Sequence, residues 1–147
     1  HSYEDYMIEK FYYYYSKAPE NAYSFYVHPI KNFGVGQGAD GFAINTNSLE
    51  GVKNFYSEIV ETNEDLFIHD DLWTSFFLFF VKNVKILSLR SELKKDKNNK
   101  ISLIYKKHIL DEGLISCYGN NINEAVRNRD KIALKSLNYM FSKIGKV

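Results

Sequence analysis

The sequence predicts an α/β fold in which a mixed sheet is flanked by helices. Short segments rich in aromatic and β-branched residues alternate with longer segments whose apolar residues recur at helical spacing. Strands that alternate with helices are typical of layered α/β domains. The chain has 147 residues, of which 45% are hydrophobic, so it is large enough to bury a core as one domain, 1–147.

A helix and a strand are expected at the start of the chain. The helix is predicted over residues 2–18, because Ser2 can cap it and its apolar residues fall on one face. Pro19 ends this helix, since proline has no N–H to continue it. The aromatic and β-branched run 22–27 then predicts a strand, which Pro29 is expected to break.

The middle of the chain combines a glycine-dense segment with two predicted helices. Residues 34–41 are expected to form a loop and residues 42–44 a short strand. Asn47 or Ser48 can cap the next helix. Its buried side would carry Leu49, Val52, Phe55, Ile59 and Val60. A strongly apolar helix over 70–83 follows, and it starts with acidic residues that the positive end of a helix dipole favours.

The rest of the chain is predicted to contain one more strand and one more helix. The strand is expected over residues 84–89, and the helix over 121–144 with an interruption near Asn128. Residues 94–100 carry almost only lysine, aspartate and asparagine, which indicates a loop. Residues 101–110 are expected to be extended.

Charge is distributed unevenly along the chain, although the net charge is only +1. Residues 1–81 carry 4 Lys or Arg against 12 Asp or Glu, and residues 82–147 carry 15 against 6. This distribution fits a ligand that is anionic at one end and metal-bound at the other, or simply a solvated charged face. Nucleic-acid binding is not predicted, because the chain is nearly neutral and has no recognition motif.

The sequence also predicts a soluble, cytoplasmic protein. Its single cysteine, Cys117, excludes an internal disulfide framework and fits a reducing compartment. No segment reaches the roughly 18 apolar residues that a membrane-spanning helix needs, and no signal-peptide pattern is present. We therefore expect no membrane span.

Three glycines, Gly36, Gly38 and Gly41, match the pattern G-x-G-x-x-G. A dinucleotide site of this type needs a strand before the glycines and a helix after them. Here Pro29 precedes them and a strand is predicted to follow, so the dinucleotide interpretation is not favoured. The glycines would still let backbone N–H groups approach phosphate or sugar oxygens, and the alternative is an ordinary glycine-rich turn.

Two adjacent carboxylates, Asp70 and Asp71, begin the apolar helix directly after His69. Neighbouring helical residues point in different directions, so one carboxylate could contact a metal-bound ligand while the other accepts a proton from an attacking hydroxyl. Trp73 lies in the next turn and could stack on a sugar ring. The alternative is a pair of helix-capping residues, and spacing alone does not separate the two interpretations.

Two further features are weaker on their own. His108 is a lone histidine, which is more often structural than functional, but it could give one imidazole to a divalent ion held mainly by carboxylates. The four tyrosines 12–15 could form a sugar-stacking platform or pack in the core. A run of four residues on a helix points in all directions, so part of it should be buried.

Taken in order, these elements resemble the C-terminal part of a glycosyltransferase of the GT-A type, and they are similar to small glycosyltransferases of AT-rich genomes, including those of large DNA viruses. The resemblance covers residues 1 to about 110. Its glycine-rich loop corresponds to Gly36, Gln37, Gly38, Ala39, Asp40, Gly41 and Phe42. Its acidic element corresponds to His69, Asp70, Asp71, Leu72 and Trp73, and its late metal-binding histidine to His108.

The resemblance implies a Rossmann-like three-layer fold and the transfer of a sugar from a nucleotide-diphosphate donor to a hydroxyl of a sugar or protein acceptor. It implies Mn²⁺ or Mg²⁺ at the diphosphate, with His108 as one ligand. Asp71, or alternatively Asp70, would be the base of an inverting displacement. The glycine-rich segment would line the substrate pocket, and Trp73 would border the acceptor.

One element of that family is missing from the sequence. The chain contains no Asp-x-Asp metal motif, so we expect this motif and the nucleotide-binding half to lie upstream of His1. The chain alone is then expected to bind donor poorly and to lack activity. The competing hypothesis is a non-catalytic α/β module that binds carbohydrate or a protein partner through exposed tyrosines, with Asp70 and Asp71 as capping residues.

Overall fold

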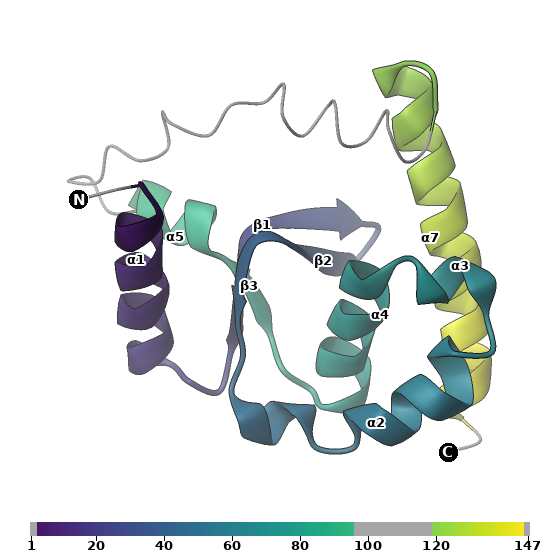
Figure 1. Ribbon diagram of the computed structural model, residues 1–147, viewed down its shortest axis with the longest axis horizontal. Coiled ribbons are helices and arrows are strands. Elements are labelled where there is room, and N and C mark those ends of the chain that lie inside the picture. The colour runs from purple at the N-terminus through teal and green to yellow at the C-terminus, as the bar shows by residue number, and fades with distance from the viewer. Residues whose placement is uncertain (1–2, 96–118, 146–147) are drawn as a thin grey trace. The chain divides into compact units, whose positions relative to one another are not determined.

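The structure is a computed structural model that describes residues 3–95 and 119–145 (Figure 1). The chain divides into two compact units, His1–Asp96 and Lys97–Val147, and each is described by itself. The expectation of a single domain, and of a longer domain to which it belongs, remains a prediction. Among the described residues, no helix is both long and apolar enough to cross a membrane.

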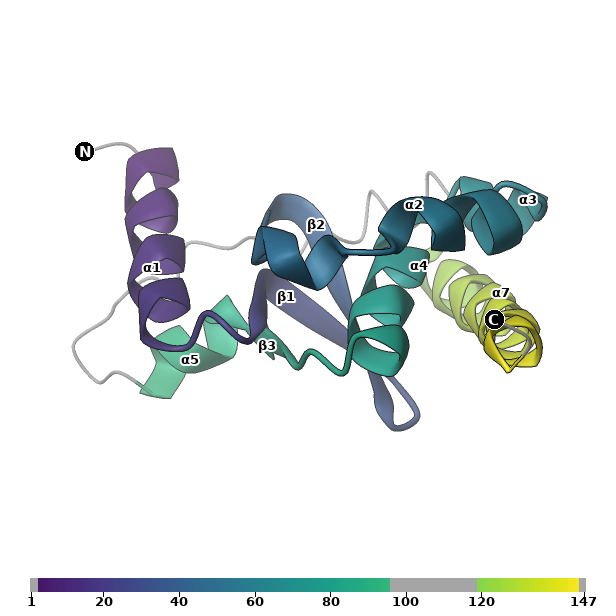
Figure 2. The same cartoon turned by 90° about the horizontal axis from the view of Figure 1, so that it is seen from below.

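A mixed sheet forms the centre of the first unit. Its three described strands are β1 (Ala22–Ile30), β2 (Phe33–Ala43) and β3 (Ile86–Ser88), in the order β2-β1-β3. β1 pairs with β2 in antiparallel fashion and with β3 in parallel fashion. Helices lie around this sheet in both views (Figures 1 and 2). The predicted α/β class with a mixed sheet and flanking helices is therefore confirmed.

The expectation that Pro29 breaks the first strand is wrong, because β1 continues through it to Ile30. Pro29 pairs with Gly34 across the hairpin, whereas β3 pairs only with residues 22–24. Of the described strands, only β2 therefore lies beside Pro29. Proline is tolerated in a strand where its missing N–H is not needed for the ladder.

The expected glycine loop over 34–41 is also wrong, since these residues belong to β2. The glycines are needed for close packing rather than for a turn. A Cβ on Gly34 would lie 2.7 Å from Cγ1 of Val27, and a Cβ on Gly36 would lie 2.6 Å from the ring of Phe42. The turn itself falls before the glycines, at Lys31, which has a positive φ of 54°.

A wide bulge interrupts the pairing of β2 with β1. Ser24 pairs with Phe42 and Tyr26 pairs with Gln37, so residues 38–41 stand opposite Phe25 alone. We call residues 38–41 the β2 bulge. Bulges bend a strand and redirect its backbone groups. The glycine-rich segment therefore leaves the regular ladder at Gly38.

The first helix, α1 (Tyr3–Lys17), confirms the helix predicted over residues 2–18. The four tyrosines 12–15 point in different directions around the helix, as helical geometry requires. Tyr12 is 73% exposed, whereas Tyr14 is half-buried and its hydroxyl donates to the backbone oxygen of Glu92 at 3.4 Å. α1 lies beside α5 (Leu89–Lys95) in both views (Figures 1 and 2).

The segment after β2 begins with a 3₁₀ turn, Thr46–Leu49, followed by α2 (Val52–Phe55). The cap is Asn45 rather than Asn47 or Ser48, because the Asn45 side chain accepts the N–H of Asn47 at 2.9 Å. α2 continues as a π-helical segment, Tyr56–Val60. Of the five residues expected on the buried side of this helix, Phe55, Ile59 and Val60 are buried. Leu49 and Val52 are only half-buried.

A short helix that the sequence did not predict, α3 (Glu64–Phe67), precedes the acidic element. The Asn63 side chain caps it by accepting the N–H of Leu66 at 3.1 Å. One helical turn is too short to show an apolar periodicity, so only the cap could have revealed it.

The apolar helix predicted over 70–83 is confirmed as α4 (Asp70–Phe76), which continues as a π-helical segment, Phe77–Val81. Phe76 and Phe77 are buried against Phe55 of α2, with ring centroids 6.0 and 5.3 Å apart. Aromatic packing therefore fixes α4 on its α2 side.

The predicted strand over 84–89 contains β3, but the predicted charged loop over 94–100 is wrong at its start. Lys94 and Lys95 belong to α5, because the buried residues Leu89 and Leu93 anchor one face of this helix. The rest of that loop and the extended segment predicted over 101–110 lie outside the described residues.

The second unit contains α7 (Ile122–Ile144), which confirms the helix predicted over 121–144. The Asn121 side chain caps it by accepting the N–H of Glu124 at 2.9 Å. The expected interruption near Asn128 is absent, since this residue lies inside the continuous helix.

Replacement of Gly36 by alanine tests the packing of β2. We expect Gly36→Ala to lower the free energy of unfolding by about 1–3 kcal/mol, because the added methyl would overlap the Phe42 ring. Gly145→Ala is the control, since a Cβ there meets nothing within 4 Å, and its effect should stay within about 0.5 kcal/mol. Chemical denaturation measures the free energy of unfolding of both variants. A Gly36→Ala variant as stable as Gly145→Ala would contradict the close packing of Gly36 against Phe42.

Candidate functional site

A carboxylate of α4 meets the backbone of β2 at the start of the bulge. The N–H of Gly38 donates to Oδ1 of Asp71 at 3.0 Å. A Cβ on Gly38 would lie 2.9 Å from the same oxygen, so the absence of a side chain permits this approach. The glycine-rich segment and the acidic element, which are 33 residues apart in sequence, therefore touch directly.

A second contact of the same kind lies one helical turn further along. The N–H of Gly36 donates to Oγ of Ser75 at 2.9 Å. Residues four apart on a helix are separated by about 6 Å along its axis. Residues two apart on a strand are separated by about 6.7 Å. The two spacings match closely, so α4 can satisfy both N–H groups at the edge of β2 at once.

The residue between these two glycines is held from the opposite side. The hydroxyl of Ser24, on β1, donates to the backbone oxygen of Gln37 at 2.7 Å. Ser24 and Ser75 are both 0% exposed. Side chains from β1 and α4 thus hold residues 36–38, where β2 enters its bulge.

The Asp71 carboxyl is half-buried, and this burial raises its pKa above the usual aspartate value. The Gly38 N–H opposes the shift, and the charge of Asp70 adds to it. The Gly38 N–H is the hydrogen-bond donor to this carboxylate within the described part of the chain. A half-buried carboxyl with one oxygen held in place and a raised pKa is suited to accept a proton.

Asp70 and His69 have different environments from Asp71. The Asp70 side chain is exposed and accepts the N–H of Asp71 at 3.0 Å, which is a local cap. Burial lowers the pKa of the His69 imidazole, while the charges of Asp65 and Asp70 oppose this shift. Of the two carboxylates in the acidic element, only Asp71 contacts the glycine-rich segment.

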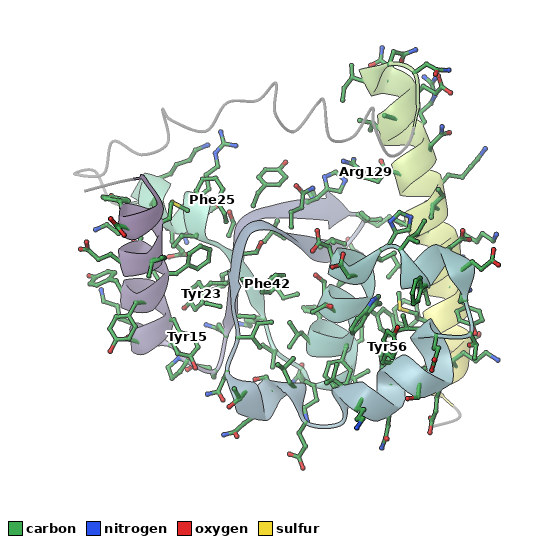
Figure 3. The ribbon with its side chains drawn as sticks, in the orientation of Figure 1. Tyr15, Tyr23, Phe25, Phe42, Tyr56 and Arg129 are labelled. Carbon is green, nitrogen blue, oxygen red and sulfur yellow. The ribbon has the colours of Figure 1, made fainter. Side chains whose placement is uncertain are left out.

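Trp73 packs against two aromatic residues, Phe55 and Tyr56. Its ring centroid lies 5.6 Å from that of Tyr56 and 6.4 Å from that of Phe55. Figure 3 shows Tyr56 on the α2 side of α4. Trp73 thus belongs to the aromatic packing between α2 and α4, and its expected place beside an acceptor remains a prediction.

The other predicted residues divide between the bulge and the part of the chain that the structure does not describe. Ala39, Asp40 and Gly41 lie in the β2 bulge, where Gly41 has a φ of 117° that favours glycine. His108 lies outside the described residues. Within residues 3–95 and 119–145, no group of three His, Cys, Asp or Glu side chains could hold a metal ion.

The dinucleotide interpretation of the glycines is dismissed by the fold. Gly36, Gly38 and Gly41 lie inside one strand, which continues through Phe42 to Ala43. No helix begins at these glycines, whereas a pyrophosphate site of that type requires a helix N-terminus there.

Sequence reasoning missed the two serines that flank the glycine-rich strand. Ser75 carried a usable signal, because it lies one turn after Asp71 and just before the apolar run 76–80. A polar residue at a buried helical position usually has a specific partner. Ser24 gave no such signal, since its position in the aromatic strand is also compatible with a surface residue.

No protein-family model, curated protein or solved structure matches this chain. Any assignment of function therefore depends on the residues and geometry described above.

Substitutions of Asp71 separate its hydrogen bond from its charge. Asp71→Asn keeps an oxygen that can accept the Gly38 N–H, whereas Asp71→Ala does not. A fully buried N–H without an acceptor costs about 1–3 kcal/mol. The Gly38 N–H is partly buried, so the alanine variant should be less stable than the asparagine variant by at most this amount.

The pH dependence of stability follows from the raised pKa of Asp71. A raised pKa means that the folded protein holds the proton more tightly than the unfolded chain. This stabilising contribution is complete below the unfolded pKa and is lost as pH rises through the folded pKa. Asp71→Asn should therefore gain stability relative to the wild type as pH rises from 4 to 7. Urea denaturation across that range measures the difference in stability between the two proteins. A loss of stability of Asp71→Asn relative to the wild type would contradict the raised pKa of Asp71.

Proposed function

We propose that this chain is the C-terminal part of a GT-A type glycosyltransferase, which transfers a sugar from a nucleotide-diphosphate donor to an acceptor hydroxyl. The observation that carries the proposal is the contact between Gly38 and Asp71 at 3.0 Å. The resemblance requires the glycine-rich segment and the acidic element to form one site. Their direct hydrogen bond supports this requirement.

The charge of Asp71 gives independent support. A neutral asparagine could accept the Gly38 N–H equally well and would avoid the cost of a half-buried charge. Burial instead raises the pKa of an ionisable carboxyl at this position. Ionisable groups with perturbed pKa values concentrate at functional sites. A role for the carboxylate as a proton acceptor accounts for its presence.

In the proposed reaction, Oδ2 of Asp71 accepts the proton of the acceptor hydroxyl. The acceptor oxygen forms a bond to the anomeric carbon of the donor sugar, and the bond from that carbon to the diphosphate breaks. The nucleoside diphosphate leaves with the electron pair, and the sugar configuration inverts. The Gly38 N–H holds Oδ1 and thereby keeps Oδ2 in a fixed direction.

The described residues do not by themselves form a site for the Mn²⁺ or Mg²⁺ that the resemblance implies. Asp70 is exposed, and His108 lies outside the described part of the chain. We therefore assign no step to a metal ion here. Its requirement, and its ligation by His108, remain predictions for the complete gene product.

The second candidate is a binding module without catalytic activity. It is favoured by the exposure of two tyrosines on α1, since Tyr12 is 73% and Tyr13 46% exposed. Lys17 places its ammonium 4.1 Å from the Tyr13 ring centroid. In this alternative, Asp71 only fastens α4 to β2.

A transfer assay on the complete gene product distinguishes the two candidates. A donor is first identified by thermal shift with nucleotide-diphosphate sugars, with and without Mn²⁺. We expect Asp71→Asn to lower turnover by a factor of about 10²–10⁴, the usual contribution of a general base, while the donor-induced thermal shift is retained. Asp65→Asn is the matched control, because Asp65 is a half-buried neighbour outside the proposed chemistry.

Near-normal turnover in Asp71→Asn would exclude Asp71 as the base. Absence of both donor binding and transfer in the wild type would reject the glycosyltransferase and favour the binding module. Loss of carbohydrate or protein binding in Tyr12→Ala and Tyr13→Ala would then support the tyrosine surface.

A further inference from the structure

Ser75 is a polar residue in an apolar environment. It is 0% exposed, and the apolar residues 76–80 follow it directly. A buried hydroxyl costs free energy unless it is hydrogen-bonded, and alanine would be a better helix former at the same position. The contact that accounts for the hydroxyl is the 2.9 Å hydrogen bond from the Gly36 N–H.

We infer that Ser75 is the positioning residue for Asp71, because its hydrogen bond to Gly36 fixes β2 against α4 and thereby places the Gly38 N–H at the Asp71 carboxylate. This inference rests on the proposed function, in which Asp71 is the base. Ser75 itself touches no reacting atom. It acts through two residues of β2.

Aromatic packing holds α4 on its α2 side, and the two hydrogen bonds fix its position along β2. With only the outer bond, at Gly38, the direction of the Asp71 carboxylate relative to β2 would be less constrained. The inner bond at Gly36 is buried, so it excludes water and fixes the register of the pair. The outer bond is only partly buried and leaves Asp71 accessible.

The loss of the inner bond should change the ionisation of Asp71. Burial is the largest influence on this carboxyl and raises its pKa, the Gly38 N–H from β2 lowers it, and the charge of Asp70 from α4 raises it. A weaker Gly38 contact removes the one influence that lowers the pKa, while the carboxyl stays half-buried beside Asp70. The pKa of Asp71 is then expected to rise further above its usual value.

The test compares Ser75→Ala with Ser75→Thr in the complete gene product. We expect Ser75→Ala to raise the pKa of Asp71, measured by carbon-13 NMR titration of its carboxyl, and to lower kcat by about ten- to a hundredfold at unchanged donor KM. Ser75→Thr retains the hydroxyl and should restore both values. If Ser75→Ala does not fold, Ser75→Cys replaces it, since a thiol is a weaker acceptor of similar size.

Ser88→Ala is the matched control. The Ser88 hydroxyl donates to the backbone oxygen of Phe25 at 3.1 Å and accepts the N–H of Ser91 at 3.2 Å, so this variant loses hydrogen bonds that do not involve Gly36 or Gly38. It should lower stability and leave the Asp71 titration unchanged. An unchanged Asp71 titration in Ser75→Ala, or an equal shift in Ser88→Ala, would overturn the inference. Because the titration needs no substrate, it decides the role of Ser75 even if no transfer activity is found.

Discussion

The edge of β2 is the constraint on which the site depends. Among the described strands, β2 lies at the edge of the sheet and carries N–H groups that none of them pairs, and α4 supplies acceptors for two of these groups. Gly36 and Gly38 donate to Ser75 and Asp71 at 2.9 and 3.0 Å, so one helix face covers two successive outward N–H groups. The position of Asp71 relative to β2 follows from this match between helix and strand spacing.

The same constraint explains the glycines better than a flexible loop would. Gly36 has the Phe42 ring on one side, and Gly38 has the Asp71 carboxylate, so a Cβ at either position would displace the side chain that it meets. Only beyond Gln37 does the strand leave the ladder, in the bulge opposite Phe25. A rigid strand therefore presents the irregular segment to the carboxylate. Such a rigid support suits a site in which a proton acceptor must keep its direction.

The sequence allowed prediction of the α/β class, α1, α4 and α7, because apolar periodicity and helix starts are local signals. Only the family resemblance implied that the glycine-rich segment and the acidic element belong to one site. The sequence did not allow prediction of β2 as a strand, since glycine is depleted in strands and the close approach of Phe42 and Asp71 depends on tertiary packing. α3 was missed because one turn shows no periodicity. The place of Asp71 was predicted only as one of two options, and burial, which no local pattern reports, separated it from Asp70.

The central claim is that the Asp71 carboxylate accepts the Gly38 N–H and so joins the two parts of the site. The most direct measurement is the scalar coupling across this hydrogen bond, between the Gly38 amide nitrogen and the Asp71 side-chain carboxyl carbon, in isotope-labelled protein. We predict a detectable coupling, together with slow exchange of the Gly38 amide hydrogen with solvent. No coupling, with fast exchange at Gly38, would contradict the account.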